Sequence, residues 1–330
     1  MKRLLKFAAI TLGLLIFLLS AAAYSFHQYK LHQEKELLQE ASLQGDLVTV
    51  DGKPMHVYEE GEGENTFVFL SGHGVVAPVY EMKGLYSLFS KHDRIAVIDR
   101  AGYGLSEKDN EGSDIDRTVN QTREMLRKSG NKPPYVLVPH SLSGIEAIYW
   151  AQKYPEEVKA ILALDIGLPR DYVNHPPTQT EKLLFRGMNV AAELGYHRMM
   201  PEQVYHPEVI KQGFLTDKEK EIYKAISFKR FLNQNVRDEM INAEANADKS
   251  VSLPAPKQTP VLLIAAYTKE NEHNKYTDYK MENYQDFVNQ LDDGEMIKVE
   301  GKHSIYLYAP EEIYEVGSSF IEHLDEDRKE

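Results

Sequence analysis

Six short apolar runs constrain the fold of this 330-residue chain more than any other feature. They cover residues 66–70, 94–98, 135–138, 158–164, 260–264 and 295–299. Continuous apolar runs of this length are typical of strands that are buried on both faces of a parallel sheet. Helical patterns separate them, at 115–128, 145–154, 276–291 and 310–324. The alternation predicts a doubly wound, mostly parallel α/β sheet with its chemistry at the carboxyl ends of the strands.

The same pattern divides the chain into segments. A hairpin around Asp51-Gly52 opens the first part of the core, residues 46–168, and residues 257–330 form the second part. Between them, residues 169–256 hold no strand-like run but helical patterns at 181–195, 207–213, 217–232 and 236–247. We interpret this stretch as a helical cap inserted before the last two core strands, with ordinary surface helices as the alternative.

The N-terminal residues 1–27 carry a membrane signal. Lys2, Arg3 and Lys6 precede an almost wholly apolar run that reaches Tyr24. A run of this length with cations on one side predicts a single-pass signal anchor in the cell membrane, with the catalytic domain outside. The alternative is a secretory signal peptide cleaved near Ala23, which would release the protein. Residues 28–45 have a polar helical pattern, and we expect them to form a stalk or linker.

Composition excludes several classes of protein. The chain has no cysteine, which rules out disulfides, Cys-ligated zinc and a cysteine nucleophile. Its net charge of −13 argues against nucleic acid as a partner. The histidines lack close metal-ligand spacing, and neither a P-loop nor a Gly-x-Gly-x-x-Gly fingerprint occurs. We therefore expect no cofactor and no metal; the sequence does not give the oligomeric state.

A serine follows the third apolar run and opens a helical stretch. The motif is Pro139-His-Ser141-Leu-Ser-Gly144, in the setting of a nucleophile elbow. A hydroxyl on such a strand-to-helix turn is exposed at the top of the sheet, and the helix N-terminus favours an oxyanion. Pro139 and Ser143 replace the usual glycines. The alternatives are a helix N-cap serine, or Ser143 as the nucleophile.

A histidine occupies the matching position after the last apolar run. His303 lies in a loop between that run and the final helical stretch. If the chain folds into one sheet, this loop returns to the same edge as Ser141. His303 is then the candidate general base on the Ser141 hydroxyl, and the acid that protonates the leaving group.

Four motifs in this order carry a family resemblance. They are Leu70-Ser-Gly-His-Gly74, Asp99-Arg-Ala-Gly-Tyr-Gly-Leu-Ser106, Pro139-His-Ser-Leu-Ser-Gly144 and Gly301-Lys-His303 followed by Ala309-Pro-Glu-Glu312. The chain resembles the cap-bearing serine hydrolases of the α/β-hydrolase superfamily over roughly residues 46–325. The resemblance implies an oxyanion hole formed by the backbone N–H groups of Leu142 and His73.

The third member of the triad is open at this stage. The resemblance places an acid a few residues after the run 260–264, but Lys269 holds the position given by counting. The neighbouring Glu270 is our first choice for the acid that orients His303. Asp165, which ends the preceding core strand, is the second choice, and Glu272 is the third.

The serine decides the expected reaction. Relatives with Asp at the elbow hydrolyse epoxides or carbon–halogen bonds, whereas Ser141 implies acyl transfer through an acyl-enzyme. We expect a carboxylic ester hydrolase that acts on small or medium acyl substrates. One alternative is an aminopeptidase similar to the proline iminopeptidases, with cap carboxylates binding the substrate amine. Another is a non-catalytic ligand-binding or sensory protein on the same fold, which the departures at Pro139, Ser143 and Lys269 would suit.

Overall fold

A central sheet organises the computed structural model, which describes residues 1–272 and 274–327. Eight strands pair in the described part, in the order β1-β2-β4-β3-β5-β6-β7-β8. Their bounds are β1 Asp46–Val50, β2 Lys53–Glu60, β3 Thr66–Leu70, β4 Arg94–Asp99, β5 Tyr135–Pro139, β6 Val158–Leu164, β7 Val261–Tyr267 and β8 Gly294–Glu300. The pairs β1–β2 and β2–β4 are antiparallel, and all the others are parallel. The predicted mostly parallel α/β sheet is confirmed.

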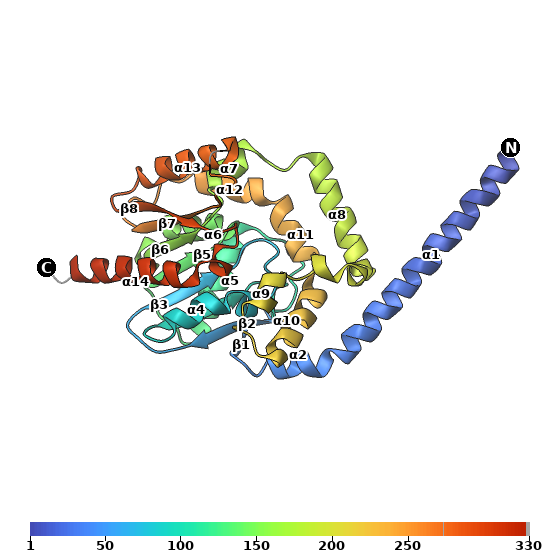
Figure 1. Ribbon diagram of the computed structural model, residues 1–330, viewed down its shortest axis with the longest axis horizontal. Coiled ribbons are helices and arrows are strands. Elements are labelled where there is room, and N and C mark those ends of the chain that lie inside the picture. Colours follow the sequence, from blue (N-terminus) through green and yellow to red (C-terminus); the bar gives the residue numbers. More distant parts are fainter. Residues whose placement is uncertain (273, 328–330) are drawn as a thin grey trace.

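Helices cover both faces of the sheet (Figure 1). The core helices are α3 Pro78–Glu81, α4 Lys83–Phe89, α5 Ile115–Lys128, α6 Ser143–Lys153, α13 Lys275–Val288 and α14 Pro310–Asp327. Alternate residues of β3 enter different cores: Phe67 packs with α4 and α14, whereas Val68 packs with α5, α6 and α13. This alternation is the period-two geometry of a strand. The sheet is therefore doubly wound.

The segment between β6 and β7, all of which the structure describes, contains helices and connecting loops but no strand. It contains α7 Pro169–Asn174, α8 Gln179–Glu193, α9 Pro207–Lys211, α10 Asp217–Arg230, α11 Gln234–Ile241 and α12 Ala243–Val251, with short 3-10 turns at Tyr196–Met199 (η2) and Pro201–Gln203 (η3). Thr178 and Thr216 begin α8 and α10 with capping boxes. The helical pattern at 236–247 corresponds to parts of two helices, α11 and α12. The cap therefore enters the fold before the last two core strands.

The N-terminal helix leaves the body of the molecule. Helix α1 spans Lys2–Gln33, and its apolar part makes it a candidate membrane span. Figure 1 shows it projecting away from the sheet, beside the cap. The short helix α2, Lys35–Ala41, follows and packs Leu38 and Ala41 into the core. The stretch predicted as a stalk is thus folded against the domain. Residues 273 and 328–330, which fall in the predicted core segment 257–330, lie outside the described residues.

A buried carboxyl in α3 makes the stability of this fold depend on pH. Glu81 is 8 % exposed, and burial raises its pKa to about 8. The folded protein therefore keeps a proton on Glu81 between its ordinary pKa of 4.5 and about pH 8, where the unfolded chain has lost it. Since the folded state binds more protons in this window, stability falls as the pH rises through it.

We expect Glu81→Gln to remove this pH dependence. The variant should be more stable than the parent by roughly 3 to 5 kcal/mol at about pH 9, and much closer to it at about pH 5. Urea unfolding of the full chain in detergent at both pH values measures the difference. Glu311→Gln, an exposed change on α14, is the matched control. An equal effect of Glu81→Gln at both pH values would contradict the assignment.

Candidate active site

The turn between β5 and α6 exposes Ser141 at the carboxyl edge of the sheet. Its φ is +54°, a left-handed conformation that a non-glycine residue seldom adopts. The turn is possible because small residues surround it. A Cβ on Gly72 would lie 2.8 Å from the Ser141 Cβ, and one on Gly144 would lie 2.6 Å from the Ile166 Cβ. Ser141 therefore has the strained geometry of a nucleophile elbow.

Ser143 has a different environment. It is 2 % exposed, and its hydroxyl lies 2.7 Å from the Leu70 carbonyl and 2.9 Å from the His140 carbonyl. The same hydroxyl accepts a hydrogen bond from the His140 N–H at 2.9 Å. Ser143 thus fastens the elbow to the end of β3, and its oxygen is already engaged. This explains how a serine replaces the second glycine of the usual motif.

A chain of two short hydrogen bonds joins Ser141, His303 and Asp165. Ser141 Oγ lies 2.8 Å from His303 Nε2, and His303 Nδ1 lies 2.7 Å from Asp165 Oδ2. With the proton on Nδ1, the ring donates to the carboxylate and accepts from the serine hydroxyl. The three residues come from the ends of β5, β8 and β6. The geometry is that of a Ser-His-Asp triad.

The Asp165 carboxylate is held by three donors. Besides His303, Lys280 of α13 donates to Oδ1 at 2.8 Å, and the Ala266 N–H donates at 2.9 Å. Lys280 also donates to the Ala266 carbonyl at 2.7 Å. Burial by itself would raise the pKa of Asp165, but the hydrogen bond from His303 and the Lys280 ammonium outweigh it and lower the pKa. Asp165 is thus kept ionised and fixed in orientation.

The acid beside His303 is therefore Asp165, the second choice of the sequence analysis. Strand β7 continues to Tyr267, paired with Glu300, so the following turn begins later than the apolar run suggested. In that turn the Thr268 N–H donates to the Asn271 side chain at 2.8 Å, and Glu270 is exposed to solvent. Among the described residues, neither Glu270 nor Glu272 hydrogen-bonds to His303. The expectation that Glu270 orients His303 disagrees with this geometry.

The predicted oxyanion donors lie on two loops at the same edge. Leu142 directly follows Ser141, and His73 lies in the loop after β3. Gly72, beside His73, makes the close approach to Ser141 described above. Neither the Leu142 N–H nor the His73 N–H donates to another group in the part of the chain that the structure describes. Both amides are therefore available to a substrate oxygen.

A buried network of side chains connects the cap to the loop after β3 that carries His73, which we call the oxyanion loop. The sequence analysis did not predict this network. Glu239 of α11 accepts a hydrogen bond from the Tyr103 hydroxyl at 2.5 Å and pairs with Arg100 Nε at 3.2 Å. It also lies 3.6 Å from His73 Nδ1, and Tyr103 accepts from the Gly74 N–H at 3.2 Å. Burial alone would raise the pKa of Glu239, but Arg100, His73 and Tyr103 together outweigh it and lower the pKa. Glu239 thus joins the cap to the loop that carries His73.

His140 is a second residue whose role the sequence did not show. Its Nε2 donates to the His303 carbonyl at 3.0 Å. Its ring also packs against the ring of His303, with the two ring centroids 4.8 Å apart. Burial and the neighbouring His303 lower the pKa of His140 to about 3, so the ring is neutral. His140 therefore holds the His303 loop in position. Its place directly before Ser141 was the one sequence signal that could have suggested this contact.

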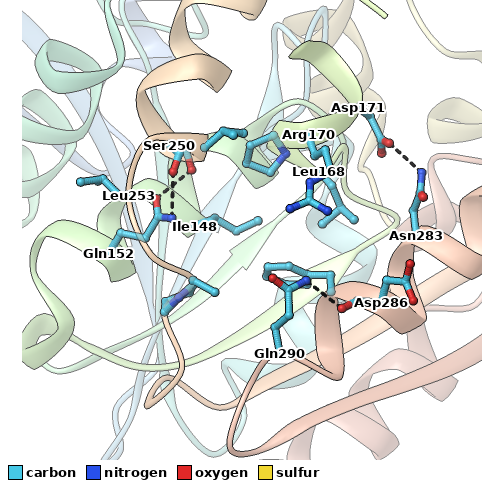
Figure 2. A pocket seen from close by; sticks show the side chains of 15 residues that line it. Ile148, Gln152, Leu168, Arg170, Asp171, Ser250, Leu253, Asn283, Asp286 and Gln290 are labelled. Carbon is cyan, nitrogen blue, oxygen red and sulfur yellow. Dashed lines mark hydrogen bonds between the residues drawn. The ribbon is translucent and has the colours of Figure 1, made fainter. Parts of the chain in front are cut away.

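The pocket in Figure 2 lies away from these residues. Its lining comes from α6, α7, α12, α13 and the segments beside them, and includes none of Ser141, His303 and Asp165. Four of its polar residues are paired with one another: Gln152 bonds to Ser250 at 2.7 Å, and Asn283 donates to Asp171 at 2.8 Å. The chemistry of the site therefore belongs to the sheet edge at Ser141.

Comparisons with known proteins agree with the fold. A family model for the alpha/beta hydrolase fold matches residues 65–310. Uncharacterized protein YbdG of Bacillus subtilis (strain 168) is 50% identical over 319 residues, which cover 97% of each chain. The 2-(acetamidomethylene)succinate hydrolase of Mesorhizobium japonicum is 26% identical over 34% of this chain and 38% of its own.

Solved structures show the same fold. The epoxide hydrolase VrEH1 from Vigna radiata superposes with a TM-score of 0.64 at 20% sequence identity, covering 85% of this chain and 98% of that structure. The eight-stranded described sheet, the residues at its carboxyl edge and these matches together place the chain in the alpha/beta hydrolase family. It is a hydrolase.

Proposed function

We propose that this protein is a serine hydrolase that cleaves carboxylic esters through an acyl-enzyme on Ser141. The observation that carries the proposal is the hydrogen-bonded chain from Ser141 Oγ through His303 to Asp165, with distances of 2.8 Å and 2.7 Å. Geometry of this kind activates a hydroxyl that is otherwise a weak nucleophile. Serine at the elbow favours acyl transfer over the epoxide chemistry named for the Vigna structure.

The reaction follows from the positions of these groups. Ser141 Oγ attacks the ester carbonyl while His303 Nε2 takes the hydroxyl proton, and Asp165 stabilises the imidazolium. The developing oxyanion accepts hydrogen bonds from the His73 and Leu142 N–H groups. His303 then protonates the departing alcohol. Water, deprotonated by His303, releases the carboxylic acid and restores Ser141.

The contacts of Glu239, the cap carboxylate beside the oxyanion loop, favour an ester over an aminopeptidase substrate. Glu239 accepts a hydrogen bond from Tyr103 on one oxygen and pairs with Arg100 through the other, so both oxygens already have partners. The non-catalytic alternative is disfavoured because a binding protein does not need the strained Ser141 backbone.

A substrate panel tests the proposal. We expect the full chain in detergent to react with a fluorophosphonate probe, and to hydrolyse nitrophenyl esters faster than a proline nitroanilide. Labelling without ester hydrolysis, combined with cleavage of the anilide, would favour the aminopeptidase. An absence of labelling under conditions where a known serine esterase reacts would favour a binding protein.

We also propose that α1 is retained as a membrane anchor, with the hydrolase domain outside. The helix runs without a break through Ala23 to Gln33, and its outer part contacts the cap at Ser20, His27 and Glu34. Cleavage after Ala23 would remove the first of these contacts. The mass of the protein from the membrane fraction tests this, because a mature N-terminus near Tyr24 would contradict it.

A further inference from the structure

Cap helix α8 has its apolar side toward solvent. Leu183, Leu184, Met188 and Val190 are exposed, with Leu183 at 67 %. In the adjoining η2 turn, Met199 is 71 % exposed and Met200, its neighbour, is exposed as well. We call these six side chains the α8–η2 face. A surface helix in water normally buries its apolar stripe, so this orientation requires an apolar partner.

Two polar side chains of the same helix, Asn189 and Lys182, point inward, whereas Glu181 and Arg186 are exposed. Asn189 is 2 % exposed; it donates to the Leu232 carbonyl at 2.8 Å and accepts from Arg237 at 2.9 Å. Lys182 lies 3.4 Å from Glu244 of α12. These bonds fix the rotation of α8 about its axis. The outward apolar side is therefore built into the cap.

The η2 turn, which carries part of this face, is attached to the candidate membrane span α1. Arg198 of η2 makes a bidentate ion pair with Glu34, with both distances 2.8 Å, and its Nε donates to His27 at 2.8 Å. Gly195 approaches so closely that a Cβ there would lie 2.5 Å from the His27 Cβ. The position of α8 relative to α1 is therefore set by direct contacts.

The contacts also set the depth of the face along α1. The apolar run from Phe7 to Phe26 is about 30 Å long at about 1.5 Å per residue, the thickness of a bilayer core. Near the outer end of this run, Ser20 bonds to Tyr196 of η2 at 2.8 Å. Helix α8 ends beside η2, and Figure 1 shows it on the side of the body from which α1 projects. The face thus lies where the bilayer surface would be.

We propose that the α8–η2 face lies in the interface of the membrane that α1 enters. Phe185 lies in sequence between the exposed leucines and Met188. Its ring packs against the ring of His73 in the oxyanion loop, with the two ring centroids 6.1 Å apart. Helix α8 therefore separates the bilayer from the catalytic edge. If the proposed function holds, its substrate is an acyl ester dissolved in the bilayer, which reaches Ser141 past this helix.

Fluorescent labels test the membrane contact without using activity. Because the chain has no cysteine, Leu184→Cys or Met188→Cys provides a single labelling site. We expect an environment-sensitive fluorophore at either position, in the full chain reconstituted into vesicles, to be quenched by nitroxide-bearing lipids and protected from iodide. Glu311→Cys, on α14, should show the reverse. Mass analysis of the reconstituted protein verifies that α1 is present.

Other outcomes would overturn the inference. Iodide quenching at positions 184 and 188 would mean that the face is in water. Protection that is lost on dilution with lipid would mean that a second copy of the chain covers it.

The substrate class is tested by kinetics. We expect Leu184→Asp with Met188→Asp to hydrolyse a water-soluble short ester at the parent rate, and a long-chain ester in vesicles about tenfold more slowly, since charges resist entry into the interface. An equal effect on both esters would contradict the substrate class. If the parent hydrolyses neither ester, the proposed function fails, and the quenching result still decides the membrane contact.

Discussion

Replacing Ser141 with alanine should reduce ester hydrolysis by about 10⁴- to 10⁶-fold in kcat, with little change in stability. Among the described residues, the hydroxyl is the only group at the elbow that is hydrogen-bonded to the His303 ring, and no covalent intermediate can form without it. The same change should abolish labelling by a fluorophosphonate. Steady-state kinetics on a nitrophenyl ester and gel detection of the probe provide the two measurements.

Ser143→Ala is the matched control for this variant. Its hydroxyl is buried and bonded to the ends of β3 and β5, so its loss should lower the melting temperature while labelling persists. If Ser143→Ala lost the probe and Ser141→Ala kept it, the nucleophile would be Ser143, and the geometry described here would not be the reactive one.

Replacing Asp165 with asparagine should reduce kcat by about 10²- to 10⁴-fold. The amide of asparagine can present an N–H to His303 Nδ1, which favours the tautomer with its proton on Nε2. That tautomer cannot accept the Ser141 proton. Glu270→Gln and Glu272→Gln should stay within about twofold of the parent, because neither carboxylate bonds to His303 in the described residues. Kinetics on a water-soluble ester at fixed pH compares the three variants.

The stability of the Asp165→Asn variant must be measured together with its activity. Lys280 would lose a buried carboxylate partner, and an uncompensated buried charge costs about 3–5 kcal/mol. Lys280→Gln separates the two effects, since it removes that charge while Asp165 still contacts His303. A large loss of activity in Glu270→Gln, with Asp165→Asn nearly unaffected, would restore the first choice of the sequence analysis.

Much of the fold could be predicted because its signals are local. The helix at 115–128 was placed at both ends, since Asp114 caps its start and Gly130 follows its end with φ +88°. The strand at 66–70 was also placed correctly, because an apolar run ends where the chain turns through small residues. The cap was harder. The pattern at 236–247 did not show the break between α11 and α12.

The site divides in the same way. Ser141 and His303 could be placed at one edge because each follows a strand of a parallel sheet. The acid could not be placed in this way. Its expected position was found by counting residues after the apolar run 260–264, and that count depends on where β7 ends. That strand runs to Tyr267 through its ladder with β8, beyond the run 260–264 from which the position was counted.

The sequence by itself determined the sheet, its helical insertion and the two residues of the expected Ser-His pair, because hydrophobic periodicity and turn residues act over short distances. Only the tertiary structure decided which carboxylate meets His303. Asp165 is held there by Lys280, which lies 115 residues further along the chain. It also decided that the apolar side of α8 faces outward, since that rotation depends on side-chain bonds to α11 and α12. Such contacts join residues that are distant in sequence, and no local pattern encodes them.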